Sequence, residues 1–480
     1  MATVQLTKHL FTFFPQLEGR ELVVPAGTVR DVVKALDEQA PGLGLYLCDE
    51  RGVLRTHVNI FNRRRAHPRP PGSLGHGVGR RARLRLAVTE RRVAMAQRIL
   101  VGTRKGTFAV EKVDGAWSPR LLGHAGSGVN FVARDPNTGT LWALLGHGHW
   151  GAKLSRSTDD GATWQDAPQI TYPEGARHYA DVLPVEGAEP PKQRPIKAST
   201  LLKLWVIAFG GDGRIYVGTI PGGLFVSSDG GESFELNRPL WNHHSRGGDL
   251  FTTDGTGDTH WWGTPASEGE FAPGIHSIAV DAQDPKRVLV AISTAGVLET
   301  RDGGETWVGR NRGMLNDYLP DPAAEWGHDP HFVELCPAQP DHVWQQNHSG
   351  VFYSSDGAAT WKRVSKPEQG VHFGFPVAVD ERDGRTAWLV PGKSDAQRTA
   401  IDGALFVART RDGGETWETL RQGLPQEHAY DVVYRHALAN SGPLLCFGST
   451  TGNLYVSEDG GDSFVAAAHN LPPIYSVRFG

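Results

Sequence analysis

Short apolar runs separated by polar turns fill the chain from residue 95 onward. One unit contains four such runs, each short enough for a β-strand, at residues 276–281, 287–292, 297–300 and 306–308. Further units have a first run that begins near residues 130, 202, 331, 372 and 430. A four-strand unit that recurs at this spacing predicts six similar antiparallel sheets arranged radially.

One turn sequence recurs in the predicted units, with the form Ser/Thr-x-Asp-x-Gly-x-Thr/Ser-Trp/Phe. Its six copies occupy residues 157–164, 227–234, 300–307, 354–361, 410–417 and 457–464. A turn aspartate accepts backbone N–H bonds, glycine supplies positive φ, and the final aromatic ring buries apolar surface. We therefore expect a structural role for the six aspartates, which are Asp159, Asp229, Asp302, Asp356, Asp412 and Asp459.

A seventh unit is divided between the two ends of this region. Residues 99–117 supply three strands and a decayed turn at 114–117, and residues 474–479 supply the fourth strand. Pairing the first and last strands removes the open edges that a ring of sheets would otherwise expose. Residues 95–480 are therefore predicted to form a mainly β, seven-bladed β-propeller closed by its last strand.

The repeated turns resemble those of the BNR or Asp-box superfamily, which includes sialidases, xyloglucan-type hydrolases and sortilin-like receptors. The resemblance implies the fold, whereas activity depends on a site that the shared motif does not supply. Residues 326–331, residues 345–348 and the ending at 471–479 are similar to bacterial proteins labelled glycosyl hydrolase or exo-α-sialidase-like. A true sialidase is disfavoured, because the Arg-Ile-Pro element and the three-arginine carboxylate clamp have no match here.

Residues 1–61 have the pattern of a different fold. Two alternating segments, 4–14 and 20–25, predict a hairpin, and Thr28 caps a helix with one apolar face. A strand is expected at 57–61. This α+β order resembles the ubiquitin-like (β-grasp) sulphur carriers of the MoaD/ThiS family, although the last strands of the roll are missing. That family acts through a free Gly-Gly carboxylate, which this chain lacks, so no sulphur-carrier role is expected.

Residues 62–94 form an arginine-rich linker in which no apolar period is clear. Residues 62–92 hold ten arginines, one glutamate and no lysine. Such a tract is compatible with a solvated linker or with a nucleic-acid or anionic-surface tail. It is also what a GC-rich gene yields when read out of frame, and Met95 then opens a natural-looking start.

The composition limits which binding partners and which cellular compartment we expect. The 480 residues carry a net charge of −4, which gives no overall reason to expect nucleic acid. No apolar run reaches the length of a membrane span, and no signal segment precedes the first strand. Three scattered cysteines imply no disulfide framework. We expect a cytoplasmic protein with no membrane partner.

Histidines and acids gather on one predicted face, built by the loops that enter each inner strand and those that join the second and third strands. The entering loops hold His276, His331, His372, Asp431 and Tyr475. The joining loops hold His147, His149, His348 and Lys393. Two long insertions add His243, His244, Asp249, Asp254, Asp258, His260, Asp317, Glu325, His328 and Asp329.

Three interpretations of this face stay open. It can bind a small molecule, a carbohydrate or a protein without catalysis, which we favour, through His276, His331, His348, His372, Tyr430 and Tyr475. It can hold a divalent transition metal through His276, His331 and His372. It can also act as a glycosidase-like hydrolase with paired carboxylates, drawn from Asp249, Glu325, Asp329 and Asp431.

Overall fold

The computed structural model divides the chain into two compact units, Met1–Met95 and Ala96–Gly480. In the second unit it describes residues 98–147, 149, 151–179, 196–249, 251 and 273–480. In the first it describes residues 2–6, 14, 17, 22–24, 29–47, 58–62 and 83–88. Each unit is described by itself.

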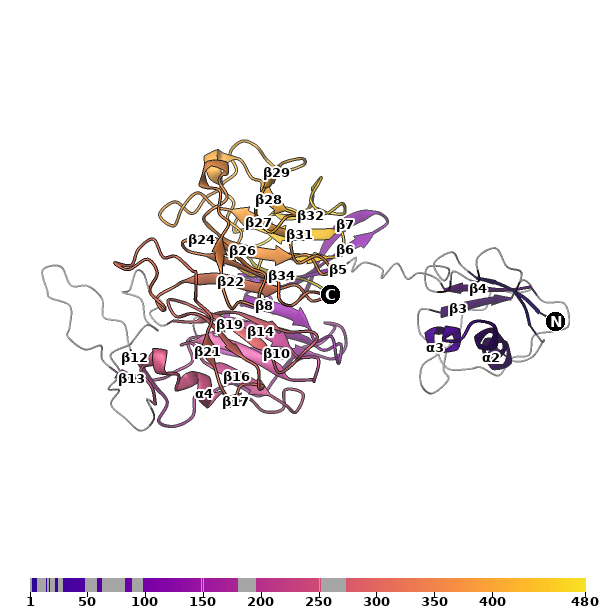
Figure 1. Ribbon diagram of the computed structural model, residues 1–480, viewed down its shortest axis with the longest axis horizontal. Helices are drawn as coiled ribbons and strands as arrows, with labels where there is room; N and C mark the ends of the chain where they lie inside the picture. Colours follow the sequence, from indigo (N-terminus) through magenta and orange to yellow (C-terminus); the bar gives the residue numbers. More distant parts are fainter. Residues whose placement is uncertain are drawn as a thin grey trace, which may run out of the picture. The chain divides into compact units, whose positions relative to one another are not determined.

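Seven four-stranded antiparallel sheets make up the described part of the second unit (Figure 1). From the inner to the outer strand, blade 1 contains β8 (Gly128–Arg134), β9 (Leu141–His147), β10 (Gly151–Ser157) and β11 (Gln165–Asp166). Blade 2 contains β14 (Lys203–Phe209), β15 (Ile215–Ile220), β16 (Leu224–Ser227) and β17 (Glu235–Leu236). Blade 3 contains β18 (Ile275–Val280), β19 (Val288–Ile292), β20 (Gly296–Thr300) and β21 (Val308–Gly309).

The remaining blades repeat this order. Blade 4 contains β22 (Pro330–Leu335), β23 (Val343–Asn347), β24 (Gly350–Ser354) and β25 (Lys362–Arg363). Blade 5 contains β26 (Gly374–Val379), β27 (Ala387–Pro391), β28 (Val407–Thr410) and β29 (Glu418–Leu420). Blade 6 contains β30 (Leu438–Ser441), β31 (Leu444–Gly448), β32 (Leu454–Ser457) and β33 (Val465–Ala468). Blade 7 contains β34 (Ile474–Phe479), β5 (Arg98–Thr103), β6 (Gly106–Val113) and β7 (Ala116–Gly123).

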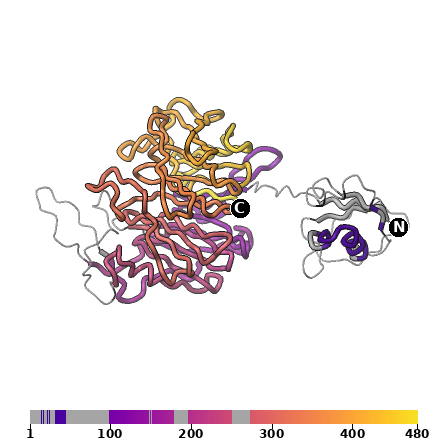
Figure 2. Tube along the Cα trace, viewed as in Figure 1, coloured from indigo at the N-terminus to yellow at the C-terminus, as the bar shows by residue number. Residues whose placement is uncertain are grey.

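The seven inner strands form a closed ring. Each packs on the next in the order β8, β14, β18, β22, β26, β30, β34 and back to β8. The last strand, β34, pairs with β5, so that the first and last segments of the propeller share one blade (Figure 2). The predicted seven-bladed propeller closed by its last strand is confirmed.

The hydrophobic core lies between neighbouring blades, and the repeated turn contributes to it. In blade 3, Asp302 accepts hydrogen bonds from the backbone N–H groups of Glu305 and Thr306 and from the Thr300 hydroxyl. Trp307, which ends this turn, is buried and donates its indole N–H to Asn237 of blade 2 at 3.0 Å. The turn thus fixes its own backbone and also joins two blades.

The same indole contact recurs around the ring. Trp164 donates to the Leu122 carbonyl, Trp361 to that of Arg310 and Trp417 to that of Val364, in each case on the preceding blade. Ala358, which replaces the glycine of the fourth turn, takes a φ of 68° and is fully buried. An L-residue in this left-handed region is strained, so the turn is held by its surroundings.

Blade 6 differs from the sequence prediction. Its inner strand was expected near Tyr430, but the strand begins eight residues later, at Leu438. The segment 431–434 is irregular, because the Val432 N–H bonds the Thr450 hydroxyl and the Val432 carbonyl accepts from the Thr450 N–H. His436 then forms an isolated bridge with Ser476 of the closing strand. The apolar run at 430–433 therefore packs without joining the sheet.

Short elements decorate the propeller. They are the β12–β13 ribbon (Arg177–Tyr179 and Ile196–Ala198), helix α4 (Arg238–Trp241), and the 3-10 turns His244–Arg246, Pro367–Gln369 and Ile401–Gly403. Among the described residues, no helix is both long enough and apolar enough to cross a membrane.

The first unit contains a mixed sheet in the order β2-β1-β4-β3, with β1 parallel to β4. Its elements are β1 (Ala2–Leu6), β2 (Leu22–Val24), α2 (Val29–Gln39), α3 (Leu43–Leu47), β3 (Val58–Asn62) and β4 (Arg83–Val88). The sequence prediction placed no strand in 62–94, yet β4 lies there, since leucines alternate with arginines at 83–86. The ubiquitin-like family of this unit stays a prediction.

Candidate functional site

A carboxylate and two imidazoles converge where blade 4 begins. Asp329 immediately precedes β22, His331 is the second residue of that strand, and His348 lies in the turn between β23 and β24. The Oδ2 atom of Asp329 is 3.5 Å from His331 Nε2 and 3.7 Å from His348 Nδ1. One donor atom from each of the three residues lies within 4.8 Å of the others.

Backbone carbonyls fix how the buried imidazoles are protonated. His331 Nδ1 lies 2.6 Å from the Gly374 carbonyl oxygen, and His276 Nδ1 lies 2.6 Å from that of Pro330. A carbonyl only accepts, so each Nδ1 carries the hydrogen. In a neutral ring, Nε2 then presents a lone pair, which His276 directs to the Ser293 hydroxyl at 2.7 Å. His331 directs its lone pair at the Asp329 carboxylate.

Burial favours the neutral form of both rings. It lowers the pKa of His331, against the opposing effect of Asp329, and it lowers the pKa of His276 to about 3, with Arg435 acting in the same direction. For Asp329, burial raises the pKa, but His331, His276 and His348 outweigh burial and hold it below its ordinary value. Its Oδ1 is buried and accepts no hydrogen bond from the described residues. The Asp329 carboxylate and His331 Nε2 are therefore in direct polar contact, at 3.5 Å.

Arg435 is a half-buried cation beside this cluster. Its guanidinium lies 4.8 Å from the Trp205 ring centre and 5.4 Å from that of Phe375, and burial lowers its pKa to about 10. The Trp205 ring meets His276 edge-on, and the Phe375 ring stacks on His331 at 4.8 Å. Two aromatic rings thus fix both histidines and the arginine, which balances part of the Asp329 charge.

The structure brings together a different set of possible metal ligands from the set that we predicted. Of His276, His331 and His372, His331 belongs to the cluster, whereas both nitrogens of His276 already have hydrogen-bond partners. His372 lies apart, with Nε2 3.9 Å from Asp317 Oδ2. Asp329 and His348 complete the group instead. Both residues were predicted for the site, Asp329 as a catalytic carboxylate and His348 as a ligand-binding residue.

The other predicted carboxylates have local partners. Asp249 accepts from the Phe251 N–H, Glu325 is exposed, and Asp431 accepts from the Thr451 hydroxyl and the Asn453 amide. They do not form the expected pair with Asp329 in the contacts of the described residues. Asp254, Asp258, His260 and the side chain of His147 lie outside the described residues.

The predicted aromatic ligands lie elsewhere. Tyr430 is 61% exposed and borders an open hollow that also includes Lys393 and His428. Tyr475 is half-buried, and its ring centre lies 6.1 Å from that of Tyr434. Arg435 and Trp205 were not among the predicted site residues. The sequence offered one signal for Arg435, because it is a single arginine within the mainly apolar segment 432–438.

No protein-family model matches the chain. Over 169 residues, or 33% of this chain, it is 30% identical to the oligoxyloglucan-reducing end-specific xyloglucanase of Emericella nidulans, of which the match spans 19%. Among solved structures, an ancestral GH74 enzyme is similar at 16% identity and a TM-score of 0.45, over 70% of this chain and 38% of that one. YCF48 from Cyanidioschyzon merolae is similar at 15% identity and a TM-score of 0.43, over 80% and 91% respectively. The propeller therefore has a xyloglucanase among its relatives.

Proposed function

We propose that the propeller is a hydrolase that uses a divalent transition metal bound by Asp329, His331 and His348. The observation that carries this proposal is the convergence of three possible ligand atoms, one oxygen and two nitrogens, within 4.8 Å of one another. Imidazole and carboxylate donors in this combination suit Zn²⁺, Mn²⁺ or Fe²⁺.

The surroundings of the three donors support a metal rather than a proton. His331 Nδ1 donates to the Gly374 carbonyl, which is the outer hydrogen bond that orients most metal-binding histidines. The buried Oδ1 of Asp329 accepts no hydrogen bond from the described residues, although burying an unpaired acceptor costs about 1–3 kcal/mol. A bound cation would compensate the charge of this carboxylate and accept the electron pair of His331 Nε2, which lies 3.5 Å from Asp329 Oδ2.

Three protein ligands leave room for water, and a metal in such a site lowers the pKa of that water to near neutrality. Arg435 lies beside the cluster and supplies a fixed positive charge toward Asp329. A cation fixed in an apolar site stabilises negative charge that develops on a substrate oxygen during hydrolysis. The reaction class draws support from the xyloglucanase relative, so glycosides are the first substrates to test.

The experiment measures metal content and hydrolysis on the full chain, purified without an affinity histidine tag. We expect close to one Zn, Mn or Fe per chain by plasma mass spectrometry. The metal should be lost in Asp329→Asn and His331→Gln. The matched control is His372→Gln, which removes a half-buried histidine outside the cluster and should keep the metal. Hydrolysis of p-nitrophenyl glycosides and esters should stop with a chelator and return with added metal.

Two results would count against the proposal. A folded chain that stays metal-free after dialysis against micromolar Zn²⁺ and Mn²⁺ would refute the metal site. A metal-loaded chain that hydrolyses none of these compounds would refute the hydrolase and favour a propeller that binds its ligand without catalysis.

A further inference from the structure

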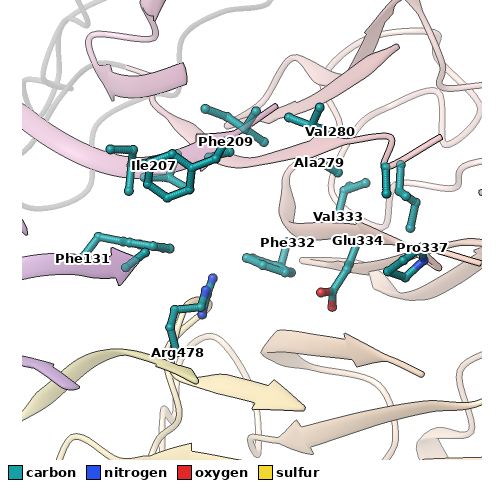
Figure 3. Close-up of a pocket in the computed structure, with 16 residues that line it drawn as sticks. Phe131, Ile207, Phe209, Ala279, Val280, Phe332, Val333, Glu334, Pro337 and Arg478 are labelled. Carbon is teal, nitrogen blue, oxygen red and sulfur yellow. The ribbon is translucent and has the colours of Figure 1, made fainter. Parts of the chain in front are cut away.

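A cavity lies at the end of the inner strands opposite the Asp329 cluster. It has a volume of about 280 Å³ and is bordered by β8, β14, β18 and β22, with Arg478 of β34 (Figure 3). Whereas His276 and His331 stand at the beginnings of β18 and β22, this cavity is lined by later residues, including Val280 and Leu335. Of its sixteen lining residues, only Glu334 and Arg478 are charged, and the others are apolar.

His436 separates this cavity from the Asp329 cluster. Its buried imidazole reaches from blade 6 to blade 3, where Nε2 donates to the His276 carbonyl oxygen at 2.6 Å. The ring centre lies 5.0 Å from that of Phe131 and 5.9 Å from that of Phe332, and both phenylalanines line the cavity. The cavity is therefore distinct from the metal cluster, and its proposed ligand does not depend on the hydrolase proposal.

The two charged groups are each anchored on one side. Arg478 Nη1 donates to the carbonyls of His436 and Val477 at 2.9 and 2.6 Å, and the guanidinium lies 4.5 Å from the Phe131 ring centre. Glu334 Oε2 accepts from the Val379 N–H at 3.2 Å. Figure 3 shows the guanidinium and the carboxyl group pointing into the same space, beside the Phe332 ring. These hydrogen bonds hold the Arg478 guanidinium and the Glu334 carboxyl group toward the cavity.

We propose that this cavity binds a small organic carboxylate with an apolar body. The planar guanidinium of Arg478 matches a carboxylate, to which it can donate two parallel hydrogen bonds. The fourteen apolar residues suit a hydrocarbon body. A cavity of about 150 Å³ accepts benzene, so about 280 Å³ has room for one aromatic ring with its acid group.

The state of Glu334 favours an anion over an ammonium ligand. Burial raises its pKa to about 7, against the opposing charge of Arg478 from β34, while Glu381 beyond β26 acts in the same direction as burial. A Glu334 carboxyl group that has taken up a proton donates a hydrogen bond to the ligand instead of repelling it. An ammonium ligand would instead face the fixed positive charge of Arg478.

The test uses 4-fluorobenzoate as the probe and the full chain, with binding followed by ¹⁹F NMR and calorimetry. The neutral control is 4-fluorobenzamide, which has the same shape and no charge. We expect the benzoate to bind more tightly than the amide and Arg478→Gln to weaken benzoate binding on the order of tenfold. Asp329→Asn should leave it unchanged, which separates this site from the metal cluster.

A second variant keeps the test decisive if Arg478→Gln fails to fold. Ala208→Phe adds an aromatic ring at a residue that lines the cavity and leaves the Arg478 and Glu334 side chains unchanged, so it should abolish benzoate binding. Its matched control, Ala466→Phe, adds the same ring on the exposed face of β33 and should bind as the unaltered chain does. Undetectable binding at millimolar benzoate, equal binding of benzoate and benzamide, or binding that survives Ala208→Phe would overturn the proposal.

Discussion

Deletion of Ile474–Gly480 removes the strand that closes the ring. This strand pairs with β5 from Ile474 opposite Thr103 to Phe479 opposite Ile99. Ile474 and Val477 are fully buried, and the Ser476 hydroxyl accepts a hydrogen bond from the Val132 N–H of blade 1. We expect the deletion to abolish cooperative folding of the propeller.

The magnitude follows from what is lost. A buried isoleucine contributes about 2–5 kcal/mol relative to alanine, and full burial of a valine about 1.5–3 kcal/mol. Each lost hydrogen bond adds about 0.5–1.5 kcal/mol. These contributions together approach or exceed the net stability of about 5–15 kcal/mol typical of a folded protein. The three strands left in blade 7 would also expose the unpaired edge of β5.

The assay is thermal unfolding followed by circular dichroism, with a graded pair of point variants beside the deletion. Val477→Ala, at a fully buried position of β34, should lower the melting temperature by several degrees. Val465→Ala makes the same change on an outer strand, at a side chain that is 52% exposed, and should have almost no effect. A deleted chain that melts cooperatively at the original temperature would show that the ring does not depend on its last strand.

The remaining predictions concern buried and turn charges. Arg287→Met should cost about 3–5 kcal/mol in urea unfolding, because it leaves buried Asp281 without its cation and removes one of the three arginines that pair with buried Glu299. Arg301→Ala, which removes an exposed partner of Glu299, should cost about 0–1 kcal/mol. Equal losses would refute the burial argument. Burial opposes the ionisation of Asp412, but hydrogen bonds from Thr416 and Thr410 outweigh burial and lower its pKa to about 2. A depressed folded-state pKa contributes stability above pH 3.8 that disappears as the pH falls toward 2. Asp412→Asn should therefore flatten the decline in melting temperature between pH 5 and pH 2, and an unchanged decline would contradict this.

The propeller was predictable because its signals are local and repeated. Each turn aspartate bonds the backbone within five residues of itself, as Asp302 does, so six copies were visible without tertiary information. The blade 6 prediction was wrong at its inner strand, since the apolar run at 430–433 finds its partner in Thr450 rather than in a sheet. Whether an apolar run joins a sheet depends on such contacts, which the sequence does not display.

The site was less predictable because distances across the ring decide it. Sequence order places His331 and His372 alike at the mouths of inner strands, yet only His331 lies beside Asp329. Nothing in the sequence brings Arg435 of blade 6 to Trp205 of blade 2, since their contact depends on closure of the ring. The positions of the histidines in the loops therefore indicated which face of the propeller carries the site, but not which residues come together there.

The pairing of β34 with β5 also determines how long β5 stays unpaired during synthesis. About 370 residues separate the end of β5 from the start of its partner. At a translation rate of about 5–20 residues per second, the edge of β5 stays unpaired for roughly 20–75 s until β34 is synthesised. During that time its backbone N–H and C=O groups can pair with any other extended segment. Slower translation therefore lengthens the time for which this edge stays unpaired.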